Sequence, residues 1–189
     1  AYLGGNPVTK DITGGNTLPK RTDLERKYLL EAFDSGRWDD WPGNEGQAAQ
    51  FQAEWAAFNK SNFCALVTNG THTLQLALES LGIGYGDEVI VPGLTWQATA
   101  STVCDVNAVP VLVDIDAETL CLDAKKIEAA ITPRTRAIIP VHLYHRMADM
   151  DVILKIAKKH KLKVIEDCAH THGSQWEGKG AGAVGDFGS

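Results

Sequence analysis

Five short apolar runs recur along the chain at intervals long enough for a helix, and this rhythm constrains the fold more than any other feature. The runs are FCALV at 63–67, EVIV at 88–91, PVLV at 110–113, AIIPV at 137–141 and KVIE at 163–166. None of them alternates apolar with polar residues, so we expect each to be a strand buried on both faces. Helix-length stretches between them, which can form the crossovers that parallel strands need, begin near Thr71, Ala98, Asp123 and Asp149. The sequence therefore predicts an α/β domain with a mainly parallel sheet flanked by helices.

The first 60 residues follow a different pattern. Residues 1–20 are rich in Gly, Pro, Asn and Thr and lack periodicity, which predicts an N-terminal arm without a core of its own. A helix is predicted to start after Thr22, which forms a capping-box pattern with Glu25, and to stop at Gly36. A second helix, over 47–59, carries an aromatic face that we expect to pack in the core. The residues of this face are Phe51, Trp55 and Phe58.

The charge balance argues against two classes of partner. The chain has 18 Lys and Arg against 24 Asp and Glu, a formal net charge of −6, whereas proteins that bind nucleic acid or anionic membranes carry an excess of basic residues. No apolar stretch approaches the roughly 18 residues of a membrane span, and no secretion signal opens the chain, so we expect a cytoplasmic protein. The four cysteines lie far apart and predict no disulfide framework.

Polar or aromatic residues follow each apolar run at the point where the predicted strand ends. They are Thr68-Asn69-Gly70-Thr71, Trp96, Asp114, His142, and Asp167 with His170. Because the carboxyl ends of parallel strands meet at one edge of a sheet, and ligands collect beyond that edge, we expect these groups to face one crevice.

Each of these groups has a functional and a purely structural interpretation. Gly70 and Thr71 join a strand to a helix, so their N–H groups could bind a phosphate, or the turn could be an ordinary helix cap. Trp96 could stack on an aromatic ligand or belong to the core. Asp167 could hold the protonated nitrogen of a pyridine ring, as in pyridoxal phosphate sites, or cap a loop or pair with a lysine. His170 could bond the ring oxygen of that cofactor or be a core histidine.

The order and spacing of six segments narrow these choices. The segments are TNGTHTLQLAL, DEVIVPGLTWQATA, VDIDAETL, TPRTRAIIPVHLY, MADMD and VIEDCAHTHGSQWEGKGAGAVGDFGS. Together they resemble the DegT/DnrJ/EryC1/StrS family of pyridoxal-phosphate aminotransferases of sugar and cyclitol biosynthesis, from about Gly36 to the last residue. The combination of TWQATA with AHTHG is most similar to the glutamine:scyllo-inosose branch, with aminohydroxybenzoate synthases as near relatives.

This resemblance implies a fold, a cofactor and a role for each site residue. The implied fold is the aspartate aminotransferase-like large domain (fold type I), and the implied cofactor is pyridoxal 5'-phosphate. Gly70 and Thr71 match the phosphate-binding turn, and Trp96 matches the residue that stacks on the pyridine ring. Asp167 and His170 match the catalytic positions beside the ring nitrogen and the ring hydroxyl. The implied substrates are an amino donor, glutamate or glutamine, and a keto-sugar or keto-cyclitol acceptor, with a homodimer as the implied assembly.

Two features depart from the family pattern. His145 follows VHLY, where relatives usually have Gly, so we expect the turn to differ and a side chain to reach the rim of the pocket. The family's Schiff-base lysine and a phosphate-binding serine come just after GDFGS, that is, beyond Ser189. We therefore expect 21–189 to be the N-terminal part of a large domain that binds pyridoxal phosphate, with the C-terminal small domain absent.

Other functions remain as alternatives or are disfavoured. Some members of the resembling family are sugar dehydratases with His in place of the lysine, and a natural end at Ser189 would favour a non-catalytic cofactor-binding module. GIGYG at 82–86 follows a helix and precedes a strand, which is the wrong context for a dinucleotide-binding turn, and no P-loop motif occurs. The pair His170 and His172 lacks a second pair of ligands, so no metal site is expected.

Overall fold

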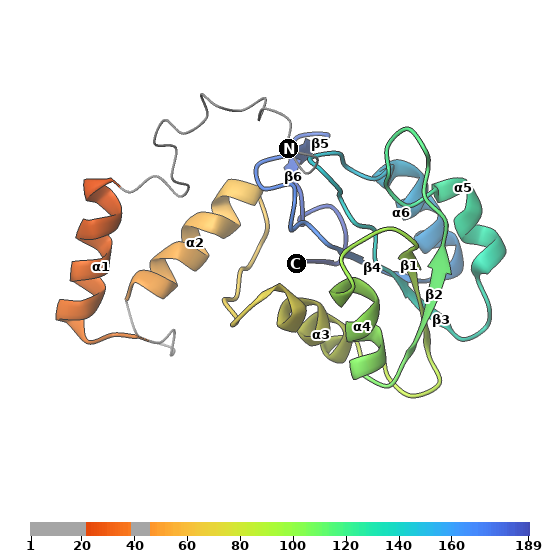
Figure 1. Ribbon diagram of the computed structural model, residues 1–189, viewed down its shortest axis with the longest axis horizontal. Helices are drawn as coiled ribbons and strands as arrows, with labels where there is room; N and C mark the ends of the chain where they lie inside the picture. Colours follow the sequence, from red (N-terminus) through yellow and green to blue (C-terminus); the bar gives the residue numbers. More distant parts are fainter. Residues whose placement is uncertain (1–21, 39–45) are drawn as a thin grey trace, which may run out of the picture. The chain divides into compact units, whose positions relative to one another are not determined.

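The computed structural model of the chain describes residues 22–38 and 46–189 (Figure 1). The chain forms two compact units, Ala1–Gln50 and Phe51–Ser189. The predicted N-terminal arm, 1–20, lies outside the described residues, and the single large domain over 21–189 stays a prediction. No helix in the described ranges combines the length and the apolar character that a bilayer span requires.

Helix α1, Asp23–Ser35, has the ends that its sequence predicts. The Thr22 side chain caps it by accepting a hydrogen bond from the Leu24 N–H, and the Thr22 N–H donates to Glu25 Oε2 at 2.7 Å, which completes the capping box. Gly36 ends the helix in the left-handed conformation, with φ of 64°. No residue of α1 is buried in the described structure, so its apolar side chains are uncovered. The large ones among them are Leu24, Tyr28, Leu29, Leu30 and Phe33.

Helix α2, Gln47–Asn59, has the predicted bounds, but the prediction that its aromatic face packs in the core is wrong. Phe51 and Phe58 are 47% and 58% exposed. Both rings contact Trp55, which lies between them on the helix. Its ring stacks on Phe51 at 5.7 Å between centroids and lies at the same distance from Phe58. Contact between neighbouring rings on one helix thus replaces contact with an opposing apolar layer.

The second unit is built on a five-stranded parallel sheet in the order β2-β1-β3-β4-β7, as predicted for its strand direction. Its strands are β1 Glu88–Pro92, β2 Val109–Val113, β3 Thr135–Ile138, β4 Lys163–Glu166 and β7 Phe187–Gly188. The connecting helices are α3 Gly70–Ser80, α4 Ala98–Asp105, α5 Ala124–Ile127 with the 3-10 turn η1 Glu128–Ala130, and α6 Met150–His160. A small antiparallel pair, β5 Gln175–Trp176 and β6 Lys179–Gly180, lies outside this sheet.

Apolar cores cover both faces of β1 and of the buried parts of β3 and β4, which explains why these strands do not alternate. Ile90 and Ile138 belong to the core that contains residues of α5 and α6. Val89, Val91 and Ile165 belong to the core on the other face, with residues of α3 and α4. Figure 1 shows the same division, with the two helix pairs on opposite sides of the strands. Successive side chains therefore enter different cores, and both must be apolar. In β2, Leu112 is 66% exposed, so the prediction that the run 110–113 is buried on both faces is wrong.

The run 63–67 is not a strand, so that prediction is wrong. Phe63 is 89% exposed and Leu66 is 40% exposed, and the Leu66 N–H donates to the Gln52 side chain at 2.9 Å. An apolar run becomes a strand only when a neighbouring strand pairs with its backbone N–H and C=O groups. None of the described strands lies beside this segment, since the sheet ends at β2 and β7.

The contact between β6 and the end of α2 predicts a stability difference between two glycine substitutions. A Cβ added at Gly180 would meet Asn59 atoms at 2.6 to 2.9 Å, including its Cα at 2.7 Å. Gly180→Ala is therefore expected to lower the free energy of unfolding by about 1–3 kcal/mol, as overpacking does. In Gly84→Ala the new Cβ would meet only the Val106 carbonyl at 3.5 Å. The free energy of unfolding of this variant should be unchanged or slightly higher. Urea unfolding followed by circular dichroism measures both, and equal effects would contradict this packing.

Candidate active site

Ser189 joins the carboxyl end of β4 to the amino end of α3. Its N–H donates to the Glu166 carbonyl, and its carbonyl accepts from the Cys168 N–H, each at 2.8 Å. Its hydroxyl contacts the Thr73 hydroxyl and donates to the Gly70 carbonyl at 3.4 Å. Two segments separated by almost a hundred residues thus meet at the edge of the sheet where the strands end.

The amino end of α3 leaves backbone donors free, as a phosphate-binding turn requires. Asn69 caps the helix by accepting from the His72 N–H at 3.0 Å, so the ordinary capping interpretation holds for that side chain. The N–H groups of Gly70 and Thr71 have no acceptor within the described residues. A Cβ at Gly70 would meet no atom within 4 Å. Such free amides, with the positive end of the helix dipole, are suited to an anion.

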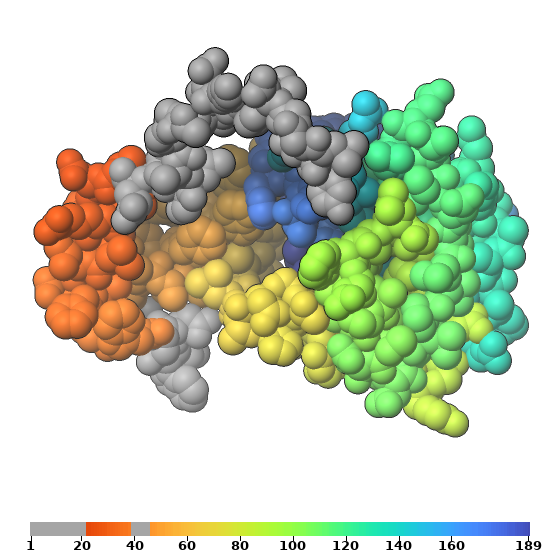
Figure 2. Space-filling view, viewed as in Figure 1, coloured from red at the N-terminus to blue at the C-terminus, as the bar shows by residue number. Residues whose placement is uncertain are grey.

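Trp96 is an exposed side chain between β1 and α4. It is 73% exposed, so the core interpretation is wrong. No other aromatic ring in the described part of the chain contacts its indole. In the space-filling view, the lime-green segment that follows β1 stands at the surface (Figure 2). The indole face is thus available to a ligand.

Asp167, directly after β4, is a buried carboxylate with no cationic partner among the described residues. It is only 7% exposed. Its Oδ2 accepts from the Thr99 hydroxyl at 2.9 Å, and its Oδ1 accepts from the Ala169 N–H at 3.3 Å, which provides part of the predicted loop cap. No lysine, arginine or histidine of the described residues pairs with it, so the lysine interpretation is wrong. A buried charge in this state favours a cationic group in a ligand.

Thr99 links this carboxylate to Trp96, and the sequence interpretation missed it. Thr99 is fully buried in the first turn of α4, and its N–H donates to the Trp96 carbonyl at 3.1 Å. Its position in TWQATA, three residues after the tryptophan, was a usable signal, because one helical turn separates the two. Ser189 and Thr73 were also missed, since their contact depends on the strand order.

His170 lines a pocket instead of the core, so the core-histidine interpretation is wrong. It is exposed, its ring stacks on Tyr144 at 5.5 Å between centroids, and its Nδ1 accepts from the Tyr144 N–H at 3.5 Å. The pocket has a volume of about 370 Å³ and is lined by Tyr144, His145, Ala169, His170 and His172. His145 lines this pocket, but Gly70, Trp96 and Asp167 do not, so entry of its side chain at the cofactor site stays a prediction.

Tyr144 and His145 both adopt the left-handed backbone conformation, with φ of 50° and 65°. This region favours glycine, because a side chain there crowds the backbone. Histidine in this conformation therefore strains the turn, and its side chain lines the pocket.

Two residues that were expected in the crevice do not reach it. Asp114 is exposed and pairs with Lys126 of α5 at 2.9 Å, which lowers the pKa of its carboxyl through that hydrogen bond. His142 is fully buried and bonds to Glu166. The rule that the first polar residue after a strand faces the crevice thus fails where that side chain has a closer partner.

Comparison with known proteins identifies relatives of the chain. Residues 19–189 match the DegT/DnrJ/EryC1/StrS aminotransferase family. An L-glutamine:2-deoxy-scyllo-inosose aminotransferase from Streptoalloteichus tenebrarius is 51% identical over 192 residues, which cover 100% of this chain and 45% of the relative. The chain thus spans less than half the length of that relative.

Two solved structures share the fold. The crystal structure of 3-amino-5-hydroxybenzoic acid synthase matches with a TM-score of 0.82 and 42% identity, over 86% of this chain and 42% of that protein. NtdA from Bacillus subtilis, with bound cofactor PMP, matches with a TM-score of 0.78 and 36% identity, over 86% of this chain and 37% of that protein. These matches confirm the predicted aspartate aminotransferase-like α/β fold of type I. The chain belongs to the DegT/DnrJ/EryC1/StrS aminotransferase family.

Proposed function

We propose that the complete protein is a pyridoxal-phosphate aminotransferase that moves an amino group from glutamine or glutamate to a keto-sugar or keto-cyclitol. The observation that carries the proposal is Asp167, a buried carboxylate with no cationic partner in the described chain. The free amides of Gly70 and Thr71 and the exposed indole of Trp96 supply the other contacts that this cofactor needs. These residues would contact the nitrogen, the phosphate and the face of one ring.

The residues of this chain would hold the cofactor and control its charge. Bound pyridoxal phosphate supplies an electron sink for the carbanion formed when a proton leaves the amino donor. Asp167 would keep the ring nitrogen protonated, since a nearby anion favours the cationic form. Thr99 orients that carboxylate through its hydroxyl. His170 would bond the ring hydroxyl. Gly70 and Thr71 would bind the phosphate, and Trp96 would exclude water from one face of the ring, which keeps the reacting bond aligned.

The name of the relative supports the finer points of the proposal. The relative that is 51% identical uses L-glutamine and 2-deoxy-scyllo-inosose by name, which favours glutamine as donor and a keto-cyclitol as acceptor, in aminocyclitol antibiotic biosynthesis. It also favours transfer over the dehydratase and non-catalytic alternatives. We expect the lysine that carries the cofactor, and acts as the general base, in the segment that follows Ser189.

We further propose that the protein acts as a cytoplasmic homodimer, without a nucleic-acid or membrane partner. The uncovered apolar side chains of α1, such as Leu29 at 71% and Phe33 at 68% exposure, are a surface that a second copy could cover. Light scattering of the complete protein measures this, and a monomer at micromolar concentration would contradict it.

Asp167→Asn tests the central role. The amide keeps the shape of the side chain but lacks the charge, so turnover by the complete enzyme should fall by about 10²-fold or more while some cofactor stays bound. Asp114→Asn is the matched control, because Asp114 also follows a strand but is exposed and paired with Lys126. Steady-state kinetics and visible absorbance measure both variants. Unchanged turnover in Asp167→Asn would reject the role.

Trp96→Ala tests the stacking contact. Loss of an aromatic contact should weaken binding of pyridoxal phosphate by roughly threefold to tenfold. Tyr85→Ala is the control, because Tyr85 is 96% exposed in the loop that precedes β1, at the opposite edge of the sheet. Titration of the cofactor-free protein with pyridoxal phosphate gives the dissociation constants. Equal constants for the Trp96 variant and the unmodified protein would remove the indole from the site.

A further inference from the structure

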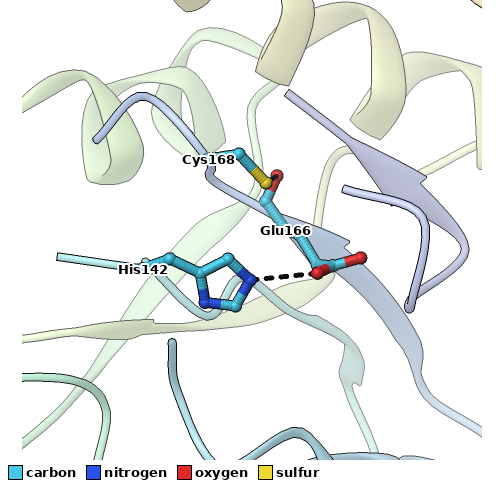
Figure 3. A group of neighbouring side chains, drawn as sticks. All are labelled: His142, Glu166 and Cys168. Atoms are coloured by element: carbon cyan, nitrogen blue, oxygen red, sulfur yellow. Dashed lines mark hydrogen bonds and ion pairs between the residues drawn. The ribbon is translucent and has the colours of Figure 1, made fainter. Parts of the chain in front are cut away.

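A buried cluster of three side chains lies next to Asp167 but takes no part in the proposed chemistry. Its members are His142, Glu166 and Cys168, with 0%, 0% and 7% exposure (Figure 3). Glu166 and Cys168 flank Asp167 at the end of β4, and His142 comes from the segment that follows β3. Its hydrogen bonds determine what it can do.

The hydrogen bonds of His142 define its tautomer. Its Nδ1 accepts from the Ala148 N–H at 3.1 Å. Because a backbone N–H can only donate, Nδ1 carries no proton. Its Nε2 lies 2.9 Å from Glu166 Oε2, as the dashed line in Figure 3 shows, and a bond to a carboxylate oxygen requires the proton on Nε2. His142 is thus a neutral donor, with both nitrogens engaged.

The Glu166 carboxylate accepts four hydrogen bonds. Besides the His142 ring, Oε2 accepts from the Gly182 N–H at 3.2 Å. Its Oε1 accepts from the N–H groups of Val184 at 2.8 Å and Gly185 at 2.7 Å. Burial raises the pKa of this carboxyl, but the bonds from His142 and the backbone outweigh it and lower the pKa on balance. Glu166 is therefore a buried anion whose charge is neutralised by fixed N–H dipoles.

The same contacts exclude a metal ion, although the three donor atoms lie within 4.8 Å of one another. Both nitrogens of His142 and both oxygens of Glu166 are occupied. Burial, with the nearby charges of Glu166 and Asp167, raises the pKa of the Cys168 thiol well above its usual range, so no thiolate is present at neutral pH. The cluster is a hydrogen-bonded support.

This support connects the turn 182–185 to the end of β4 at close range. A Cβ added at Gly185 would meet the Val164 carbonyl at 2.8 Å. Glycine at this position lets the turn lie against β4, which brings its N–H groups within reach of Glu166. The turn leads directly into β7 and Ser189, at the amino end of α3.

The backbone of Asp167 is held by the segment that follows β3. Its N–H donates to the Pro140 carbonyl at 2.9 Å, and its carbonyl accepts from the His142 N–H at 3.0 Å. Its side chain bonds to Thr99 of α4, whereas that of Glu166 bonds to His142 and the turn, as expected for successive residues of a strand. The two carboxylates therefore serve opposite faces.

We propose that Glu166 and His142 are positioning residues, which fix the end of β4 and the turn 182–185 so that Asp167 and the amino end of α3, which Ser189 contacts, face one ligand. The inference rests on the proposed function, since it takes Asp167 as the partner of the ring nitrogen. Glu166 touches neither the cofactor nor the substrate. It acts through the backbone it anchors.

Glu166→Gln in the complete protein is the test, with Glu88→Gln as the matched control. The NH₂ group of glutamine cannot accept a hydrogen bond. The two hydrogen bonds that one carboxylate oxygen accepts from N–H groups are therefore lost, without a change in side-chain size. Glu88 is also a buried carboxylate, 4% exposed and bonded to Arg134, but it starts β1, at the opposite edge of the sheet. Both variants should unfold at a lower urea concentration than the unmodified protein. Only Glu166→Gln should weaken pyridoxal phosphate binding, by roughly tenfold, as loss of a supporting partner does, and shift the visible absorbance band of the bound cofactor.

Asp167→Asn in the same titration separates the two proposals. If Asp167→Asn leaves both affinity and absorbance unchanged, the proposed function fails. If Asp167→Asn alters the absorbance while Glu166→Gln behaves like Glu88→Gln, the positioning role is overturned and the proposed function stands.

A measurement on the unmodified protein covers the case in which Glu166→Gln does not fold. A ¹H–¹⁵N spectrum of the imidazoles should show His142 with one protonated and one unprotonated nitrogen, and the proton should exchange slowly with solvent. Two protonated nitrogens, or binding of Zn²⁺ that shifts these signals, would overturn the assignment.

Discussion

The site depends on how two consecutive carboxylates are buried, one at the last residue of strand β4 and one directly after it. Burying a charge is costly unless hydrogen bonds or an opposite charge compensate it. Glu166 accepts four N–H donors and needs nothing further. Asp167 accepts one hydrogen bond from a hydroxyl and one long hydrogen bond from a backbone N–H. No cation of the described chain pairs with it. Glu166 is therefore a structural anion, whereas the Asp167 carboxylate is left for a cationic group of a ligand.

The loop that follows β3 contains two strained residues and is anchored by the hydrogen bonds of His142. Tyr144 and His145 hold left-handed conformations, which cost about 1–2 kcal/mol each for residues with a side chain. The loop is anchored at both ends, because His142 bonds to Glu166 and also accepts from the Ala148 N–H. The buried cluster behind the site can thus sustain a strained turn that places His145 in the pocket lining.

Position in the pattern predicted where polar residues lie along the chain, but not what they contact. Asp114, His142 and Asp167 each stand at or just beyond the end of a predicted strand, and they have three different environments. Asp114 is exposed beside Lys126, and His142 is buried against Glu166. Asp167 is buried, and no cation in 22–38 or 46–189 pairs with it. Each outcome depends on a side chain from another element, and local spacing carries no information about that neighbour.

The sequence by itself determined the local features. The helix ends at Thr22 and Gly36 and the bounds of α2 follow from caps and periodicity, which act within a few residues. The parallel direction of the strands follows from non-alternating apolar runs separated by connections long enough for a helix. The tertiary structure alone decided that 63–67 stays unpaired, that Thr99 and Ser189 join the site, and that Glu166 lies behind Asp167. Those outcomes require partners that are distant in the chain, and only the order of strands in the sheet brings such partners together.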